Sequence, residues 1–293
     1  MEGHFPDRGL PYLLVAPSVA IVLIFLLIPS GEALLQSLSR INPFTGAGRF
    51  VGLENFTSLL ASEEYRHSIR VSVLFTAGTV LLSLSASLAM AALVNRSLRG
   101  IGIYRTALIW PYALSPAVAG TIWALLFEPS TGLITFALRE MTGAAPNWMM
   151  SGSLALLVVI LAAAWKLLGY NIMFFLAGLQ AVPEELAEAA AVDGASAWHR
   201  FWAVTFPLLS PVTFFLLITN SLYAFFEVFG LIDVLTQGGP ARATDVLVYK
   251  LYRDGFVSIN WGQASAQSVL LFVLVAALTV LQFRYAGRRV FYT

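Results

Sequence analysis

Six long runs of apolar residues leave few folds open to this chain. The hydrocarbon core of a bilayer is about 30 Å thick, so a helix of about 20 apolar residues spans it. Lipid offers no hydrogen-bond partners to the backbone, so each run is predicted to be helical. The predicted spans are residues 11–34, 70–94, 105–127, 153–179, 206–230 and 265–286. We therefore expect an all-α membrane protein with six transmembrane helices.

The composition agrees with a lipid environment and excludes several function classes. Hydrophobic residues make up 58% of the 293 residues and charged residues only 11%, too few to cover a soluble globule. The net charge is +1 and the basic residues are scattered, so nucleic-acid binding is not expected. The absence of cysteine rules out disulfides and thiolate metal sites. His4, His67 and His199 do not share a helix face, so no metal site is predicted.

The first span is predicted to be a retained anchor. Arg8 precedes it, as in a secretory signal, but the apolar run reaches Ile28 and no small-residue cleavage site follows. We divide the chain into an N-terminus (1–10), the anchor (11–34), a five-helix core (70–286) and a tail (287–293).

Short arginine-bearing segments predict the orientation of the spans. Arginines without nearby acids lie between the second and third spans and at the end of the sixth: Arg96, Arg99 and Arg105, and then Arg284, Arg288 and Arg289. With six spans, these two segments lie on the same side as the N-terminus. The positive-inside rule makes that side cytoplasmic, so both termini are predicted to be cytoplasmic.

A polar loop at 183–207 interrupts the apolar pattern on the same predicted cytoplasmic side. Pro183 opens a short Ala-rich helix that presents Glu185 and Glu188. Asp193-Gly194 ends this helix, because glycine adopts the left-handed conformation readily. A second short helix, from about 195 to 203, leads to Pro207. Two short helices with small side chains favour docking into a groove of a partner protein.

This loop resembles the EAA loop of bacterial ABC-importer permeases. The matching strings are Glu188-Ala189-Ala190, Asp193-Gly194-Ala195 and the later Pro207. In that family the loop is the coupling helix that seats in a cytosolic ATPase, within a MetI-like permease fold. The resemblance therefore implies these ATPase-coupling residues: Glu185, Glu188, Ala189, Ala190, Asp193, Gly194, Ala195 and Pro207.

Further strings resemble the permeases of sn-glycerol-3-phosphate importers within the carbohydrate-type class. They include Ile109 to Ala113, Tyr223 to Phe226, the TQGGP turn at 236–240, Tyr249 to Phe256, and Gln282 to Tyr285. Phe206, Glu227 and Asn260-Trp261-Gly262 depart from that pattern. The solute implied is sn-glycerol-3-phosphate or a related glycerophosphodiester, and a sugar or oligosaccharide remains the alternative.

The resemblance also implies the partners and the compartment. They are a second homologous permease, a cytosolic ATPase dimer that binds ATP and Mg²⁺, an extracytoplasmic solute-binding protein, a small-molecule solute and the bacterial inner membrane. This chain is expected to hold no cofactor, because Lys166 and Lys250, its only lysines, stand in no phosphate-binding loop. No catalytic residues are predicted. A secondary transporter is the alternative of another class, disfavoured because we find neither an internal repeat nor paired intramembrane carboxylates.

Lys166 is a charge near the centre of the fourth predicted span. Such a charge costs a few kcal/mol or more unless it has a partner or faces water. It either lines a substrate pathway, with Tyr170, Asn171, Asn220 and Tyr223 at similar depth, or is structural, held by helix carbonyls or by a carboxylate of another subunit. Glu227 lies roughly 15 Å from the midplane at 1.5 Å per residue, so a direct pair is not expected.

Three further patterns concern helix packing and shape. Thr79, Ser83, Ser87 and Ala91 form a small-residue stripe that predicts close helix contact. Pro17, Pro29, Pro111 and Pro116 predict either fixed kinks or irregular helices beside a pathway. The segment 246–256 has a mixed amphipathic pattern with interfacial aromatics, so we expect it along the outer surface, as a lid or as a landing place for a partner.

Overall fold

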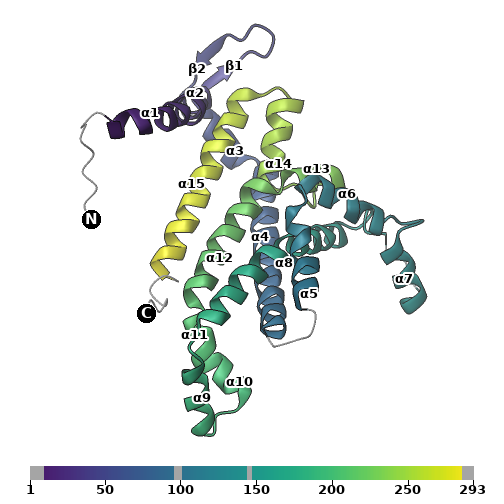
Figure 1. The fold of residues 1–293 in the computed structure, drawn as a ribbon. Coiled ribbons are helices and arrows are strands. Elements are labelled where there is room, and N and C mark those ends of the chain that lie inside the picture. The colour runs from purple at the N-terminus through teal and green to yellow at the C-terminus, as the bar shows by residue number, and fades with distance from the viewer. Residues whose placement is uncertain (1–9, 96–100, 144–146, 286–293) are drawn as a thin grey trace. The chain divides into compact units, whose positions relative to one another are not determined.

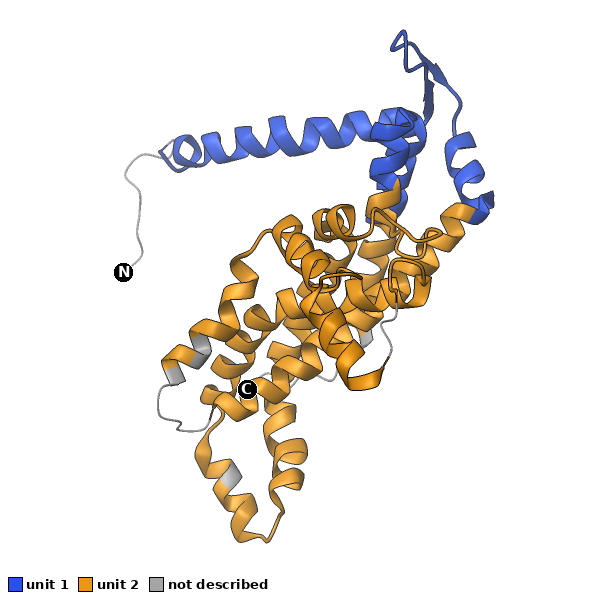
Figure 2. Cartoon of the chain, turned by 90° about the vertical axis from the view of Figure 1, so that its right-hand side faces the viewer, with its two compact units in different colours: residues 1–63, 251–272 blue, residues 64–250, 273–293 orange. Residues whose placement is uncertain are grey.

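The computed structural model describes residues 10–95, 101–143 and 147–285, and these are mostly helical (Figure 1). The chain divides into two compact units (Figure 2). Unit 1 comprises 1–63 and 251–272, and unit 2 comprises 64–250 and 273–293. Except for Leu10, the predicted terminal segments 1–10 and 287–293 lie outside the described residues.

The predicted anchor is one long helical segment of unit 1. Helix α1 (Leu10–Val22), a π-helical turn (Leu23–Leu27) and α2 (Ile28–Ser37) follow one another without a break, and together they are long and apolar enough to cross a membrane. The most apolar stretch of this segment buries no residue within the protein. Exposed apolar side chains along a whole helix are what lipid contact requires.

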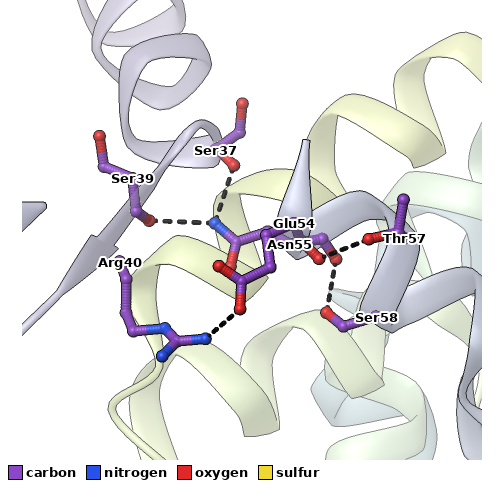
Figure 3. A network of polar contacts seen from close by, with 7 residues as sticks. All are labelled: Ser37, Ser39, Arg40, Glu54, Asn55, Thr57 and Ser58. Atoms are coloured by element: carbon purple, nitrogen blue, oxygen red, sulfur yellow. Dashed lines mark hydrogen bonds and ion pairs between the residues drawn. The ribbon is translucent and has the colours of Figure 1, made fainter. Parts of the chain in front are cut away.

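A short β-hairpin and a helix follow the anchor in unit 1. Strands β1 (Ser39–Ile41) and β2 (Gly48–Phe50) pair antiparallel, and α3 (Glu54–Ala61) comes next. The buried Asn55 side chain donates hydrogen bonds to the carbonyls of Ser37 at 2.9 Å and Ser39 at 3.0 Å (Figure 3). These bonds tie α3 to the end of the anchor. The apolar pattern of the sequence did not predict this hairpin.

Unit 2 is built around two uninterrupted helices, α4 (Glu63–Val94) and α8 (Gly152–Ala181). The predicted small-residue stripe of α4, from Thr79 to Ala91, is fully buried. Ala91 belongs to a core cluster with Ile172 and Phe175 of α8 and with Leu216. Helix α15 (Trp261–Tyr285) runs through the end of unit 1 into unit 2 and forms the last predicted span.

The third predicted span, 105–127, is a broken helix. Helix α5 (Ile101–Ile109) continues into a 3-10 turn (Trp110–Ala113), and α6 (Pro116–Leu126) leaves at an angle of 111°. Leu114 and Ser115 between them are extended. A proline forces the preceding residue out of the helical conformation, and Pro116 therefore explains the break. The structure thus shows an irregular helix at these prolines.

The fifth predicted span is also bent. The stretch from Ala197 to Leu208 meets α12 (Ser210–Leu222) at 67°, and a π-helical turn (Tyr223–Glu227) continues α12 before α13 (Phe229–Leu235). Pro211 occupies the first turn of α12, where a proline is tolerated. Within the described residues, four helices are long and apolar enough to cross a membrane, or six if each bent pair is one span.

The start of the 246–256 segment is buried in unit 2, so the expectation of a surface-lying helix was wrong there. Helix α14 (Leu247–Tyr252) opens with Leu247, whose backbone N–H donates to Ser72 of α4 at 2.7 Å. Lys250 is 4% exposed and pairs with Glu64 at 3.8 Å. Burial against α4 satisfies both groups and overrides the amphipathic pattern. A π-helical turn (Arg253–Val257) follows α14.

One further helix of unit 2, α7 (Leu133–Thr142), follows α6 along the chain.

Gly169 of α8 provides a test of helix packing in unit 2. A Cβ atom at this position lies 2.7 Å from the Ile109 Cα atom and 2.8 Å from the Ile109 carbonyl oxygen of α5. Overpacking a tight helix contact costs about 1–3 kcal/mol, so Gly169→Ala is expected to lower the thermal midpoint of the purified protein. The control is Gly102→Ala in α5, where the added Cβ meets nothing within 4 Å. Equal midpoints for the two variants would contradict this contact.

A candidate coupling hairpin and a polar cluster in the membrane

The polar loop folds into a helical hairpin of unit 2, and its helices α9 and α10 lie below α11 in the view of Figure 1. Helix α9 (Glu184–Val192) follows α8 directly, with Pro183 as its N-cap residue rather than its first helical residue. Glu184 and Glu185 lie in its first turn, where carboxylates interact favourably with the helix dipole. The first half of the hairpin is thus a short helix with an acidic beginning.

The turn after α9 forms where the Asp193-Gly194 pair predicts it. The Ala195 N–H donates to the Ala190 carbonyl and the Gly194 N–H to the Ala191 carbonyl, each at 3.0 Å. This pair of bonds is the Schellman arrangement, which requires a left-handed residue at the position of Gly194. Gly194 has φ +84°, and a Cβ atom there would meet nothing within 4 Å. Glycine is therefore needed for its backbone conformation, while the space above it is open.

The second half of the hairpin returns to the membrane segment. The Ser196 side chain accepts a hydrogen bond from the His199 N–H at 3.3 Å and caps α10 (Ala197–Arg200). A π-helical turn (Phe201–Thr205) and the short α11 (Phe206–Leu208), which contains Pro207, complete the path to α12. The hairpin therefore links α8 to α12.

The predicted coupling residues present a largely exposed surface. Glu185, Glu188, Ala189, Asp193 and Gly194 are exposed, and Ala190, Ala195 and Pro207 are partly exposed. The exposed methyl groups and the bare Gly194 turn allow another backbone to approach closely. The geometry suits a docking surface, as the sequence predicts.

Lys166 lies at the centre of a buried polar cluster in unit 2. It is 6% exposed, and its Nζ atom donates to the Tyr112 carbonyl oxygen at 3.4 Å. The same Nζ lies 5.3 Å from the centre of the Tyr112 ring and 5.6 Å from that of the Tyr223 ring. Two aromatic faces and a carbonyl oxygen all stabilise a cation. Glu227 forms no ion pair with Lys166 within the described residues, as the helix spacing predicts.

The other predicted pathway residues fall into two groups. Tyr170 joins the Lys166 cluster, because its ring stacks on that of Tyr112 at 5.0 Å between centres. The buried Asn220 donates a hydrogen bond to Ser83 of α4 at 3.3 Å. Asn171 is fully buried, and within the described part of the chain neither atom of its amide has a hydrogen-bond partner.

Sequence reasoning missed Tyr112 as the main partner of Lys166. Tyr112 lies in the 3-10 turn between α5 and the break of the third span, which brings its carbonyl and its ring to α8. The available signal was the pair Pro111 and Pro116, which marks a point where helix carbonyls lose their usual partners. A lysine at the same depth is a natural donor to such a carbonyl.

Comparison with known proteins identifies the family. Residues 84–292 match the model of the binding-protein-dependent transport system inner membrane component. The chain belongs to this family. It is a multi-pass permease of the inner membrane, and the permease subunit is not by itself an enzyme.

Relatives match the permease over nearly its whole length. The protein named "sn-glycerol-3-phosphate transport system permease protein UgpA" of Agrobacterium fabrum is 49% identical over 98% of each chain. Proteins of the same name from Rhizobium meliloti and Yersinia pestis are each 48% identical over 98% of this chain, and over 98% and 97% of their own lengths. These matches support the predicted class of ABC-importer permease.

Solved structures show the same fold. A chain in the crystal structure of a bacterial alginate ABC transporter, in complex with a periplasmic protein bound to alginate pentasaccharide, superposes with a TM-score of 0.83. It covers 96% of this chain and 95% of its own, at 20% identity. A second structure of an alginate importer gives 0.81 at 21% identity, with 96% of each chain covered. The predicted all-α permease fold is confirmed.

Gly194→Asp is expected to impair coupling without unfolding the permease. The substitution strains the left-handed turn, and its side chain occupies the space where a partner backbone approaches. Co-purification with the ATPase and solute uptake are both expected to fall, while the thermal midpoint of the isolated chain changes little.

Gly143→Asp is the matched control for this prediction. Gly143 has φ +71° and is likewise free of atoms within 4 Å of an added Cβ, but it ends α7, far along the chain from the hairpin. Normal assembly and uptake of the Gly194→Asp variant, or equal defects in both variants, would contradict a docking role for the Gly194 turn.

Proposed function

We propose that this chain is a transmembrane permease subunit of an ATP-driven importer for sn-glycerol-3-phosphate or a related glycerophosphodiester. The observation that carries the proposal is the 48–49% identity, over 98% of the chain, to permeases named for sn-glycerol-3-phosphate. This identity covers the membrane spans, the hairpin and the loops alike, because the matches include 98% of the chain.

The proposed importer contains four kinds of component. This chain pairs with a second homologous permease, both sit on a cytosolic ATPase dimer, and an extracytoplasmic binding protein delivers the solute. ATP and Mg²⁺ are bound and used by the ATPase, and this chain holds no cofactor. The hairpin is accordingly placed on the cytoplasmic side with both termini. Of the arginines that predict this orientation, Arg96, Arg99, Arg288 and Arg289 lie outside the described residues.

The position of the hairpin in the chain supports a role in coupling. It connects α8, which carries Lys166 and Tyr170, to α12 and the π-helical turn with Tyr223. Closure of the ATPase displaces the hairpin, and the displacement reaches both helices through connections of a few residues. Because Lys166 lies on α8 and Tyr223 lies in the turn that continues α12, relative movement of α8 and α12 changes the polar cluster directly.

The chemistry of the polar cluster favours an anionic solute. A phosphate monoester carries about one to two negative charges, and an unpaired charge is costly at membrane depth. Lys166 supplies the opposite charge, and Tyr170, Asn171, Asn220 and Tyr223 supply hydrogen-bonding groups. In this proposal they form the substrate pathway, with Lys166 lowering the barrier for the phosphoryl group.

A sugar or oligosaccharide remains the second candidate solute. The alginate importers share the fold, but an identity of 20–21% carries no information on the solute. Titration of the cognate binding protein with sn-glycerol-3-phosphate, glycerophosphodiesters and neutral sugars separates the candidates.

Solute-stimulated ATP hydrolysis tests the proposal in the reconstituted importer. We expect sn-glycerol-3-phosphate with its binding protein to stimulate hydrolysis and uptake, and neutral sugars to have no effect. The isolated chain is the control and is expected neither to bind nor to hydrolyse ATP. Stimulation by a neutral sugar alone would overturn the solute assignment, and specific ATP labelling of the isolated chain would overturn the division of roles.

Lys166→Met tests the pathway assignment. Removing the cation is expected to reduce uptake of the phosphorylated solute far more than basal ATP hydrolysis or assembly. The control is Lys250→Met, which removes the other lysine of the chain, outside the cluster, where it pairs with Glu64. Failure of the Lys166→Met variant to assemble, or uptake at the normal rate, would assign Lys166 a structural role at the helix break.

A further inference from the structure

The two halves of the hairpin differ in chemistry. Between Pro183 and Ala195 the charged residues are all acidic: Glu184, Glu185, Glu188 and Asp193. Between Ser196 and Leu208 the only charged residue is Arg200, next to the polar ring of His199, and there is no acid. Within the described residues no ion pair joins the two halves. The acidic half and the basic half can therefore each contact a different partner.

The second half carries a row of aromatic side chains. The rings of Trp198 and Trp202 lie 5.6 Å apart between centres, and those of Trp202 and Phe206 lie 4.8 Å apart. Trp198 is 72% exposed and Trp202 is 43% exposed. Neither indole N–H has a hydrogen-bond partner among the described residues. A large apolar ring with a free N–H at one edge is best accommodated at a membrane interface, where the ring contacts acyl chains and the N–H contacts water or headgroups.

This row is continuous with a membrane-spanning segment. The stretch from Ala197 to Leu208 forms one candidate span together with the stretch from Ser210 to Glu227. Residues 198, 202 and 206 are spaced by one helical turn, so the row leads along one face toward α12. Tryptophan is enriched where a span meets the headgroup region. The position of the row along the chain therefore matches the boundary of the membrane.

The charge of each half agrees with that position. The cytoplasmic leaflet carries anionic lipids, which attract basic residues near its surface and repel acidic ones. His199 and Arg200 lie next to the aromatic row, whereas α9 and the Gly194 turn carry every predicted ATPase contact except Pro207.

We propose that Trp198, Trp202 and Phe206, with His199 and Arg200, form a contact surface for anionic lipid headgroups of the cytoplasmic leaflet. The surface anchors one half of the hairpin in the membrane interface and leaves α9 to the ATPase. The inference rests on the proposed function for the side of the membrane and for the role of α9.

Spin labels can locate the two halves in the assembled importer. The chain contains no cysteine, so Trp202→Cys and Ala189→Cys each provide one labelling position, with cysteine-free partners. The full importer is placed in nanodiscs of phosphatidylethanolamine and phosphatidylglycerol. Collisions with oxygen, which concentrates in lipid, are compared with collisions with a nickel chelate, which stays in water. We expect oxygen collisions to dominate at residue 202 and both to be suppressed at residue 189.

Each other outcome has a definite meaning. Suppression of both collisions at residue 202 means that a protein covers the row, and nickel collisions there mean that it faces water; either result overturns the lipid contact. Free nickel collisions at residue 189, with lipid contact retained at residue 202, contradict the proposed coupling role and leave the lipid contact standing.

A second measurement avoids a cysteine in the row. In nanodiscs with brominated phosphatidylglycerol, the wild-type importer is expected to lose more tryptophan fluorescence than the Trp202→Phe variant, because residue 202 contributes quenched emission. Equal losses overturn the proposal even if the Trp202→Cys variant fails to assemble.

Discussion

The need to satisfy every backbone polar group without water is the constraint on which this structure depends. Unbroken helices such as α4 and α8 meet it by themselves. The third span does not, because its helix stops at Ala113 and resumes at Pro116. One carbonyl of that turn, on Tyr112, accepts a hydrogen bond from Lys166 at 3.4 Å. The break and the buried charge therefore compensate one another: the carbonyl gains a donor and the lysine gains a partner.

Lys166 therefore stabilises the helix break and can still interact with an anion. A single bond of 3.4 Å and two ring faces hold the lysine, and among the described residues no carboxylate forms an ion pair with it. An ion pair at this depth would be costly to separate. A cation held by a carbonyl and aromatic faces keeps its charge available to an anion, because none of these partners neutralises it. The two roles considered for Lys166 are thus compatible in one geometry.

Features set by neighbouring residues could be predicted from the sequence, whereas contacts between residues far apart in the chain could not. The end of α9 at Asp193-Gly194 was predictable because a Schellman turn depends on neighbouring residues alone. The positions of the apolar helices followed from the apolar runs, but the bends of 111° and 67° did not. The pairing of Lys166 with Tyr112 depends on the 111° break, and Pro111 and Pro116 indicate a break without its angle. The burial of Leu247 and Lys250 depends on Ser72 and Glu64 of α4, which amphipathic periodicity cannot include.

The hairpin can transmit force because its own shape is fixed by short-range bonds. Two backbone bonds lock the turn at Gly194, and the Ser196 cap fixes the start of α10. The hairpin is joined to α8 at one end and to α12 at the other, so a displacement of α9 reaches both helices. If the row from Trp198 to Phe206 is held in the membrane interface, that row becomes the pivot, and pressure on α9 turns the hairpin about it. The short connection from α9 to α8 then moves α8 relative to α12, the two elements between which Lys166 and Tyr223 meet.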